Sequence, residues 1–329
     1  MHCYNTEAFT VGEAVYNKNQ NKRDCPQVGC TVFNFTAPTR CVLDKLGGAV
    51  GTYFGDEIDV FSNEPNDCNK VDAICFAGGS VNGLIAVAGV AEALVKQAIQ
   101  NGKKEWESKD KDAYYKIPIV KGAITFSGAW GKVRKWKPPD AELGKMALKN
   151  ATNTNVSLGQ HGAGSNSEIG SILTGEWGAE GGQGAHCEWN DGFYCAVYCN
   201  LNSKGAILGM DGKVLYGPKK EDGTFYGNLF RSTNILIHTN AKCKSMDLMR
   251  QLARQVHVSI ARVIFPYSAH SDGDALFLTS TEQKEVVDTT ALGVFFSKCL
   301  WKAVHSVASH QASHQASHQA GTTVTQLKL

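Results

Sequence analysis

An α/β fold is predicted from three features of the sequence. Residues 71–77 (VDAICFA) form a continuous apolar run, which is typical of a strand buried on both faces. Gly78-Gly79-Ser80 follows this run, and apolar residues then recur at steps of 3 and 4 over residues 84–99. That spacing predicts one face of a helix that ends near Gly102. Further strand-like runs and helical periodicities alternate along the rest of the chain.

The remaining elements follow in order. Strand-like or apolar runs lie at 117–126, 193–201, 206–210, 232–240 and 275–281. Helices are predicted after Pro138-Pro139-Asp140, over 248–263 and over 289–307. Three segments are expected outside these elements: a charged surface excursion at 103–116, a solvated basic loop at 132–137 and glycine-rich loops close to a site at 151–192.

Composition narrows the class of protein. The chain has 329 residues, is 43% hydrophobic and carries a formal net charge of +2, so it can bury a sizeable core but lacks the basic footprint of a nucleic-acid or membrane-surface binder. No stretch approaches the roughly 18 apolar residues of a membrane helix. The N-terminus lacks the basic start and apolar run of a signal peptide. We therefore expect a cytoplasmic chain with mostly reduced thiols.

The cysteines do not predict a metal site. Eleven cysteines are present, and Cys195 and Cys199, with His186 and Cys187 upstream, are the group that most resembles zinc ligands. A four-residue step within a strand separates two sulfurs by about 13 Å, at roughly 3.3 Å per residue. Buried small side chains explain these cysteines better, so we expect no metal site.

The C-terminal tail contains a short repeat. Ser-His-Gln-Ala occurs three times over residues 309–320. A helix would stack His310, His314 and His318 along one face as a possible metal ladder. A low-complexity, disordered extension over 309–329 is the favoured interpretation.

A glycine-rich turn offers a first candidate nucleophile. Residues 78–83 (GGSVNG) nearly match the Gly-x-Ser-x-Gly elbow that exposes a serine between a strand and a helix, with Asn82 in place of the second glycine. Ser80 would be the nucleophile. A tight turn that packs the helix on the sheet explains the same residues and is the favoured interpretation.

Ser232 offers a second candidate nucleophile. Arg231-Ser232-Thr233 opens a predicted strand, and Asp272 and Asp274 precede another. A hydroxyl needs a base beside it, and cleavage before the serine would supply its own α-amine, with a pKa near 7.7–8.0. The two aspartates would hold the ammonium or orient the hydroxyl. Taken alone, a loop-to-strand junction explains these residues equally well.

Several blocks in one order resemble a known family. They are GGAVGTYFGDEID, DAICFAGGSVNGLIAVAGVAEAL, the Asn202–Gly205 NxxG motif, RSTNILIHTN, QLARQVHVSIARVIFPYSAHSDGDALFLTST and TTALGVFFSKCLWKAV. Together they resemble the L-aminopeptidase/D-esterase family of self-processing N-terminal-nucleophile hydrolases, which includes β-aminopeptidases and a nylon-oligomer endohydrolase. The resemblance covers roughly residues 25–307 and is strongest at 72–94 and 232–281.

The resemblance implies a four-layer αββα sandwich of the N-terminal-nucleophile-like, ornithine acetyltransferase-like type. It implies one domain over 1–308, cleaved between Arg231 and Ser232. The family's oxyanion-stabilising asparagine falls on Asn202, and its acidic or hydroxyl pair falls on Asp272 and Asp274. Gly79 and Ser80 would line the substrate site. Related enzymes form tetramers or octamers and need no cofactor.

Three residues depart from the family pattern. Arg231 stands where relatives carry Asn or Gly, which predicts slow self-cleavage. Phe126 replaces a tyrosine expected near the pocket, and Ser171 replaces a lysine of the nylon-oligomer hydrolase. Both positions are expected to line the substrate site, so these departures affect efficiency and substrate.

The leading hypothesis is a self-processing amide hydrolase that acts on small peptides or on non-peptide amides such as 6-aminohexanoate oligomers. We expect no nucleic-acid or membrane partner and a homo-oligomer. Two alternatives stay open: a non-catalytic binding protein that retains the sandwich, and a serine hydrolase that uses Ser80.

Overall fold

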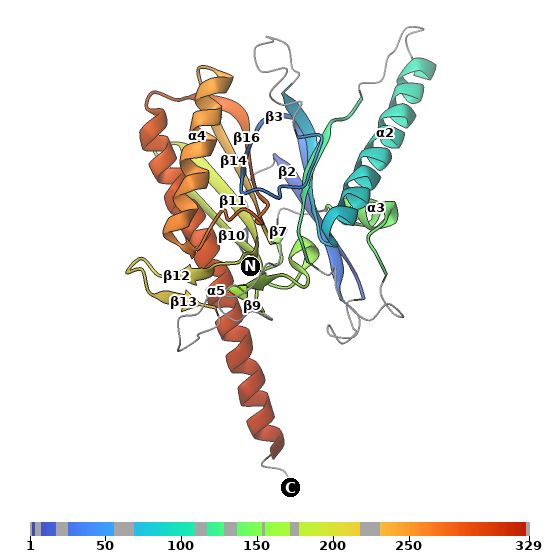
Figure 1. Ribbon diagram of the computed structural model, residues 1–329. Coiled ribbons are helices and arrows are strands. Elements are labelled where there is room, and N and C mark those ends of the chain that lie inside the picture. Colours follow the sequence, from blue (N-terminus) through green and yellow to red (C-terminus); the bar gives the residue numbers. More distant parts are fainter. Residues whose placement is uncertain are drawn as a thin grey trace.

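Two sheet layers lie face to face between two pairs of helices (Figure 1). The computed structural model describes residues 2–3, 8–17, 26–55, 69–108, 117–127, 137–152, 155–171, 178–217 and 231–326. The four long helices are α2 (Gly83–Ser108), α3 (Ala141–Lys149), α4 (Met246–Ser259) and α5 (Thr289–Gln326). In Figure 1, α2 and α3 cover one side of the molecule, and α4 and α5 cover the other.

The layers are the two halves of one hydrogen-bonded sheet. Its strand order is β10 (Gly182–Asn190), β11 (Phe193–Asn202), β14 (Ser232–Lys242), β16 (Asp274–Glu285), β3 (Val28–Leu46), β5 (Lys70–Ala77), β6 (Val120–Ile124) and β4 (Thr52–Tyr53), and β2 (Phe9–Tyr16) also pairs with β3. The first part of β3 pairs with β2 and β5, and its last part pairs with β16. The long strand β3 therefore carries the chain from one layer to the other.

Short strands surround this sheet. They are β1 (His2–Cys3), β7 (Asn155–Val156), β8 (Glu168–Ile169), β9 (Ala179–Glu180), β12 (Ala206–Leu208), β13 (Val214–Tyr216) and β15 (Ile264–Phe265). β8 pairs with β9, and β12 pairs with both β13 and β15.

Three buried clusters fill the spaces between the four layers. One joins β11 and β14 to α4 and α5, and another joins β3 and β5 to α2 and α3. The third lies between the sheet layers and is rich in aromatic rings, among them Phe33, Phe76 and Tyr198. This arrangement confirms the predicted αββα sandwich.

The central strands read as continuous apolar runs because both of their faces are buried. In β11, Cys195, Val197 and Cys199 face the helices, whereas Ala196 and Tyr198 face the opposite sheet layer. Alternate side chains of a strand point to opposite faces, so a middle layer needs apolar residues at every position. The cysteines of β11 thus serve as small core residues, and burial raises the pKa of the Cys199 thiol.

Two predictions of secondary structure are wrong. The helix expected to end near Gly102 continues to Ser108, because an internal glycine costs only about 1 kcal/mol and the following KKEWES segment favours helix. Residues 182–190, expected as loop, form β10 and pair along their whole length with β11. Their glycines allow close packing: a Cβ on Gly184 would lie 2.4 Å from the Ala303 carbonyl oxygen on α5.

The segment Ser80–Gly102 is long and apolar enough to cross a membrane, with a mean hydropathy of 1.3, contrary to the expectation from the sequence. One face of this segment nevertheless packs in the core, where Ala86, Val87 and Val90 are fully buried. Its amphipathic spacing, with an apolar face toward the sheet, is what an α/β fold requires of a covering helix.

The C-terminal repeat continues a helix. α5 extends through residues 309–320 to Gln326, where the sequence predicts a disordered extension. Gln311 is buried and its Nε2 donates to the Gly181 carbonyl oxygen at 2.7 Å, so the first repeat packs on the body. The side chains of His314 and His318 lie outside the described residues.

Replacing Gly144 with alanine is expected to lower the free energy of unfolding by about 2 kcal/mol. Helices α2 and α3 approach with their backbones in contact, and a Cβ at Gly144 would lie 1.9 Å from the Ala86 carbonyl oxygen. Thermal unfolding measures the effect. The matched control is Met146→Ala, two residues away on the exposed side of α3; equal melting temperatures for the two variants would contradict the close packing.

Candidate active site

Ser232 and Asn202 lie opposite each other on neighbouring strands. Ser232 is the first residue of β14, Asn202 is the last residue of β11, and the antiparallel register pairs them directly. Side chains of directly paired residues point to the same face, with their Cβ atoms about 4.5–5.5 Å apart. Both residues are buried. The pairing therefore brings together the nucleophile and the oxyanion-stabilising amide that the sequence resemblance implies.

The segment after β6 holds both of these side chains through its main chain. The Phe126 N–H donates to Ser232 Oγ at 2.8 Å, and Asn202 Nδ2 donates to the Phe126 carbonyl oxygen at 2.9 Å. In the same segment, Thr125 Oγ1 accepts a hydrogen bond from Asn200 Nδ2 at 2.6 Å. Position 126 thus acts through its backbone, which a phenylalanine supplies as well as the tyrosine expected there.

Glu168 is a residue of the site that the sequence did not indicate. Its main-chain N–H donates to Asn202 Oδ1 at 3.0 Å, so it fixes the second side-chain atom of the asparagine. Its carboxylate pairs with Arg231 Nη2 at 2.6 Å, and the two side chains are only 18% and 7% exposed. Burial raises the pKa of Glu168, and the nearby guanidinium of Arg231 opposes that rise. No local pattern points to Glu168, because its partner lies 63 positions away.

Asp272 and Asp274 meet Ser232 at the same edge of the sheet. β14 and β16 run parallel, so both strands begin there. The Thr233 N–H donates to Asp274 Oδ1 at 2.8 Å, and Arg231 forms a parallel bridge with Asp272. Within the described part of the chain, Asp272 Oδ1 and Asp274 Oδ2 are buried and accept no hydrogen bond. The pair thus offers two free acceptor oxygens beside the start of β14.

The two carboxyl groups have raised pKa values. Burial raises the pKa of Asp274 well above its usual range, and the charge of Asp272 raises it further. Burial also raises the pKa of Asp272, while Lys204 and Arg231 oppose that rise. Asp274 therefore keeps its proton to a higher pH than an exposed aspartate does.

Lys204 is a second residue whose place the sequence did not indicate. It is buried two residues after Asn202, and its Nζ donates to Ser271 Oγ. The turn that carries it needs Gly205, because a Cβ there would lie 2.2 Å from the Pro266 carbonyl oxygen. This close approach explains the NxxG spacing, and it places an ammonium group beside the loop that carries Asp272.

The peptide bond between Arg231 and Ser232 is held in place by the loop before β16. The Arg231 carbonyl oxygen accepts the Gly273 N–H at 2.8 Å, and the Arg231 N–H donates to the Ser271 carbonyl oxygen at 3.3 Å. Gly273 approaches the backbone so closely that a Cβ there would lie 2.3 Å from the Ala49 carbonyl oxygen. A hydrogen-bond donor therefore points at the carbonyl that self-cleavage would attack.

Gly79 and Ser80 adjoin the site but lack the geometry of a nucleophile. The Gly79 N–H donates to the Ser127 carbonyl oxygen at 2.8 Å, and the Ser80 N–H donates to the Thr125 carbonyl oxygen at 3.1 Å. Ser80 has the φ of +58° expected of a strained turn. Among the described residues, however, its hydroxyl forms no hydrogen bond with a histidine or a carboxylate, whereas an activated serine needs such a base.

Ser171 adjoins the turn after Asn202. The preceding residue, Gly170, donates its N–H to the carbonyl oxygens of Ser203 and Gly205, at 3.1 and 3.0 Å. Ser171 itself is buried. Of the basic segment 132–137, expected as a solvated loop, residues 132–136 lie outside the described residues.

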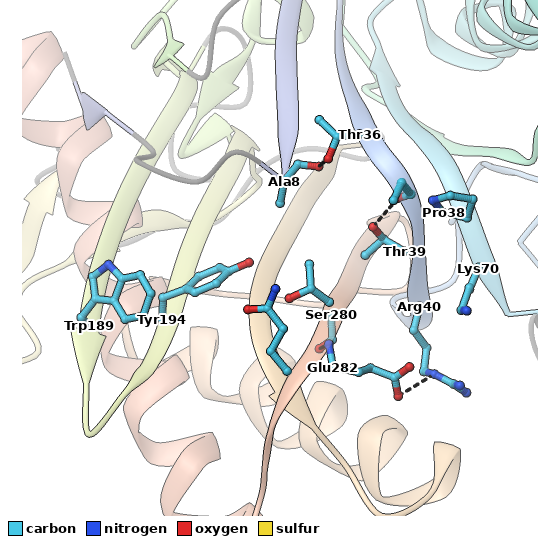
Figure 2. Close-up of a pocket in the computed structure, with 13 residues that line it drawn as sticks. Ala8, Thr36, Pro38, Thr39, Arg40, Lys70, Trp189, Tyr194, Ser280 and Glu282 are labelled. Atoms are coloured by element: carbon cyan, nitrogen blue, oxygen red, sulfur yellow. Dashed lines mark hydrogen bonds and ion pairs between the residues drawn. The ribbon is translucent and has the colours of Figure 1, made fainter.

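Two other features lie away from Ser232. His186, Glu188 and Cys299 could offer three ligand atoms to a metal ion, all within 4.8 Å of one another, but Glu188 is already paired with Lys302 at 2.5 Å. A cavity of about 490 Å³ opens at the far end of β16, six residues or roughly 20 Å from Asp274. Figure 2 shows it between the Arg40–Glu282 ion pair and the rings of Trp189 and Tyr194.

Comparison with known proteins identifies relatives over most of the chain. A family model described as peptidase family S58 matches residues 63–326. The 6-aminohexanoate-oligomer endohydrolase of Paenarthrobacter ureafaciens is 27% identical over 336 residues, which cover 92% of this chain and 85% of that protein. An uncharacterized aminopeptidase of Mycobacterium tuberculosis is 26% identical over 315 residues, which cover 84% of each chain.

Two solved structures share the fold. A β-aminopeptidase of Burkholderia sp. superimposes with a TM-score of 0.63 at 17% identity, over 91% of this chain and 84% of that one. The L-aminopeptidase D-Ala-esterase/amidase of Ochrobactrum anthropi gives a TM-score of 0.64 at 15% identity, over 92% and 84% of the two chains. The latter is described as a variant of the Ntn hydrolase fold, and the present chain has that fold.

Proposed function

The chain belongs to peptidase family S58 and is an amide hydrolase, and we propose that it cleaves itself before Ser232 and uses the freed N-terminal serine as its nucleophile. One observation supports this proposal above the others. The Arg231–Ser232 peptide bond lies between the Gly273 N–H, which bonds the Arg231 carbonyl oxygen, and the Phe126 N–H, which bonds the Ser232 hydroxyl. Both reacting groups of a self-cleavage are thus held in place.

In the self-cleavage, Ser232 Oγ attacks the carbonyl carbon of Arg231 and forms a five-membered ring. The Gly273 N–H stabilises the negative charge that develops on the carbonyl oxygen. Asp274 takes the hydroxyl proton and passes it to the Ser232 nitrogen as the C–N bond breaks, which leaves an ester. Water then hydrolyses the ester and releases an Arg231 carboxylate and a free Ser232 α-amine.

In the turnover of substrate, the free α-amine replaces the carboxylate as base. An α-amine has a pKa near 7.7–8.0, so a large fraction is neutral and able to accept the Ser232 hydroxyl proton near neutral pH. Asn202 Nδ2 carries two N–H groups. One is directed at the Phe126 carbonyl oxygen, and the other donates to the oxyanion of the substrate. Asp272 and Asp274 hold the ammonium form of the amine between proton transfers.

The substrate class proposed is a small peptide or a non-peptide amide. The named relatives include endohydrolases of 6-aminohexanoate oligomers and aminopeptidases. Because this chain belongs to the same family as these relatives, their kinds of amide substrate support this proposal.

The pH dependence of self-cleavage tests the proposal. The attack needs an ionised carboxylate, so the rate of fragment formation is expected to fall as the pH drops through the raised pKa of Asp274. In Asp272→Asn, one negative charge next to Asp274 is lost, so the pKa of Asp274 falls and the acid limb moves to lower pH. Denaturing gels of purified protein incubated across the pH range measure both profiles.

Two results decide this test. Amide turnover is expected to increase in step with the fragment that begins at Ser232, because the α-amine exists only after cleavage. Amidase activity in fully intact protein, or an acid limb that does not move in Asp272→Asn, would contradict the proposed mechanism. A serine-reactive phosphonate provides a further check, since it should label Ser232 and not Ser80.

A further inference from the structure

Arg231 occupies the candidate site with its side chain as well as with its carbonyl group. Its guanidinium is 7% exposed and bonds the Glu168 carboxylate at 2.6 Å. The charge of Asp272 also acts on it, and both carboxylates oppose the fall in the pKa of Arg231 that burial causes. A buried arginine with two acidic neighbours is a built ionic contact, in contrast to an exposed surface ion pair.

This contact shows where part of a substrate binds, an inference that rests on the proposed function. In the self-cleavage, the Arg231 carbonyl becomes an ester on Ser232 Oγ. A substrate forms an ester on the same oxygen when its amide bond is cleaved. The side chain of Arg231 therefore marks where the acyl group of a substrate extends from the nucleophile, and after hydrolysis the new chain end can leave that space.

Glu168 stays behind when Arg231 leaves. Its main-chain N–H is bonded to Asn202 Oδ1, so the carboxylate keeps a fixed position relative to the amide that faces the oxyanion. Without Arg231, its one described cationic partner is gone. Leaving a largely buried carboxylate without a counter-ion costs free energy. An acyl group that carries a cation restores the ion pair that Arg231 forms in the precursor, and it therefore binds more tightly.

We propose that Glu168 selects substrates whose acyl group ends in a cation, with about five or six atoms between the carbonyl carbon and the charged nitrogen, as in arginine and lysine. In the precursor, the side chain of Arg231 pairs with Glu168 in the way proposed for the cation of a substrate. Glu168 is in this sense a specificity-determining residue, distinct from the residues that act on the reacting atoms.

The test compares two substrates that differ in charge but hardly in shape. Arginine p-nitroanilide and citrulline p-nitroanilide are offered to the processed wild-type enzyme and to Glu168→Gln, with rates normalised to the amount of fragment that begins at Ser232. The wild type is expected to prefer the arginyl substrate by about 10- to 100-fold in kcat/KM, the value of a hydrogen bond to a charged group. In Glu168→Gln the ratio is expected to fall close to one, with most of the change in KM.

A purely structural role for Glu168 would lower both rates equally and leave the ratio unchanged. If Glu168→Gln fails to process because the buried Arg231 has lost its partner, the comparison is made between Arg231→Gln and Arg231→Gln/Glu168→Gln, in which no buried guanidinium is left unpaired. Arg231→Gln retains Glu168 and is expected to keep the wild-type preference.

The outcomes separate this inference from the function on which it rests. A processed enzyme that cleaves neither anilide overturns the proposed function and the inference with it. Turnover of both anilides at similar rates by the wild type, or a preference for arginine that persists without Glu168, overturns the inference alone. Loss of the preference together with Glu168 supports it.

Discussion

Ser232→Ala is expected to yield a single uncleaved chain with no amidase activity. The substitution removes the oxygen that attacks Arg231 and later the substrate, while the methyl group fits the same buried position. Since the intact chain also has no α-amine at residue 232, the loss in kcat should be on the order of 10⁶, as expected when a nucleophilic serine is removed. Denaturing gels and an anilide assay on the same preparation measure both effects.

Ser232→Thr and Ser80→Ala are the matched controls for this prediction. Threonine keeps the hydroxyl, so the variant should still process and turn over substrate, at lower rates because the added methyl group crowds a buried position. Ser80→Ala removes the hydroxyl from the neighbouring turn and should leave processing intact. Activity retained in Ser232→Ala and lost in Ser80→Ala would transfer the nucleophile to Ser80.

Asn202→Ala is expected to lower kcat by about 10²- to 10³-fold, the usual effect of removing one oxyanion donor. The alanine also frees the Glu168 N–H and the Phe126 carbonyl oxygen, which Asn202 bonds. Part of the loss could therefore come from a displaced backbone. Steady-state kinetics on processed protein measure the loss, and thermal unfolding shows how much of it accompanies reduced stability.

Asn202→Asp separates the donor from the acceptor. The carboxylate can still accept the Glu168 N–H through Oδ1 but has no N–H to donate. If the donor carries the effect, this variant should lose as much activity as Asn202→Ala. A kcat near that of the wild type in Asn202→Asp would contradict the oxyanion role of the amide.

The α/β class and the burial of the central strands could be predicted from local sequence patterns, whereas the four-layer αββα arrangement followed only from the family resemblance. β5 and β11 lie in middle layers, so their continuous apolar runs reveal burial on both faces. The end of α2 could not be read from Gly102, since a helix tolerates a single glycine when good helix formers follow it. β10 was hidden for a related reason: its glycines suggest loop, but here they admit close contact with α5.

The site was predictable only in part. The resemblance pointed to Ser232, Asn202 and the two aspartates, and the register of β11 and β14 and the parallel β16 bring these residues to one edge. Glu168 and Gly273 carried no such signal. One pairs with a residue 63 positions away, and the other contributes only its main-chain N–H, which no side-chain pattern reveals.

The mass of the purified wild-type protein tests the central claim most directly. Self-cleavage between Arg231 and Ser232 predicts two fragments, residues 1–231 and 232–329, whose masses add up to that of the 35.5 kDa chain plus one water. Ser232→Ala should give the intact mass alone. A wild-type protein that hydrolyses amides while its mass stays that of the intact chain, or a C-terminal fragment that begins at any residue other than Ser232, would contradict the account.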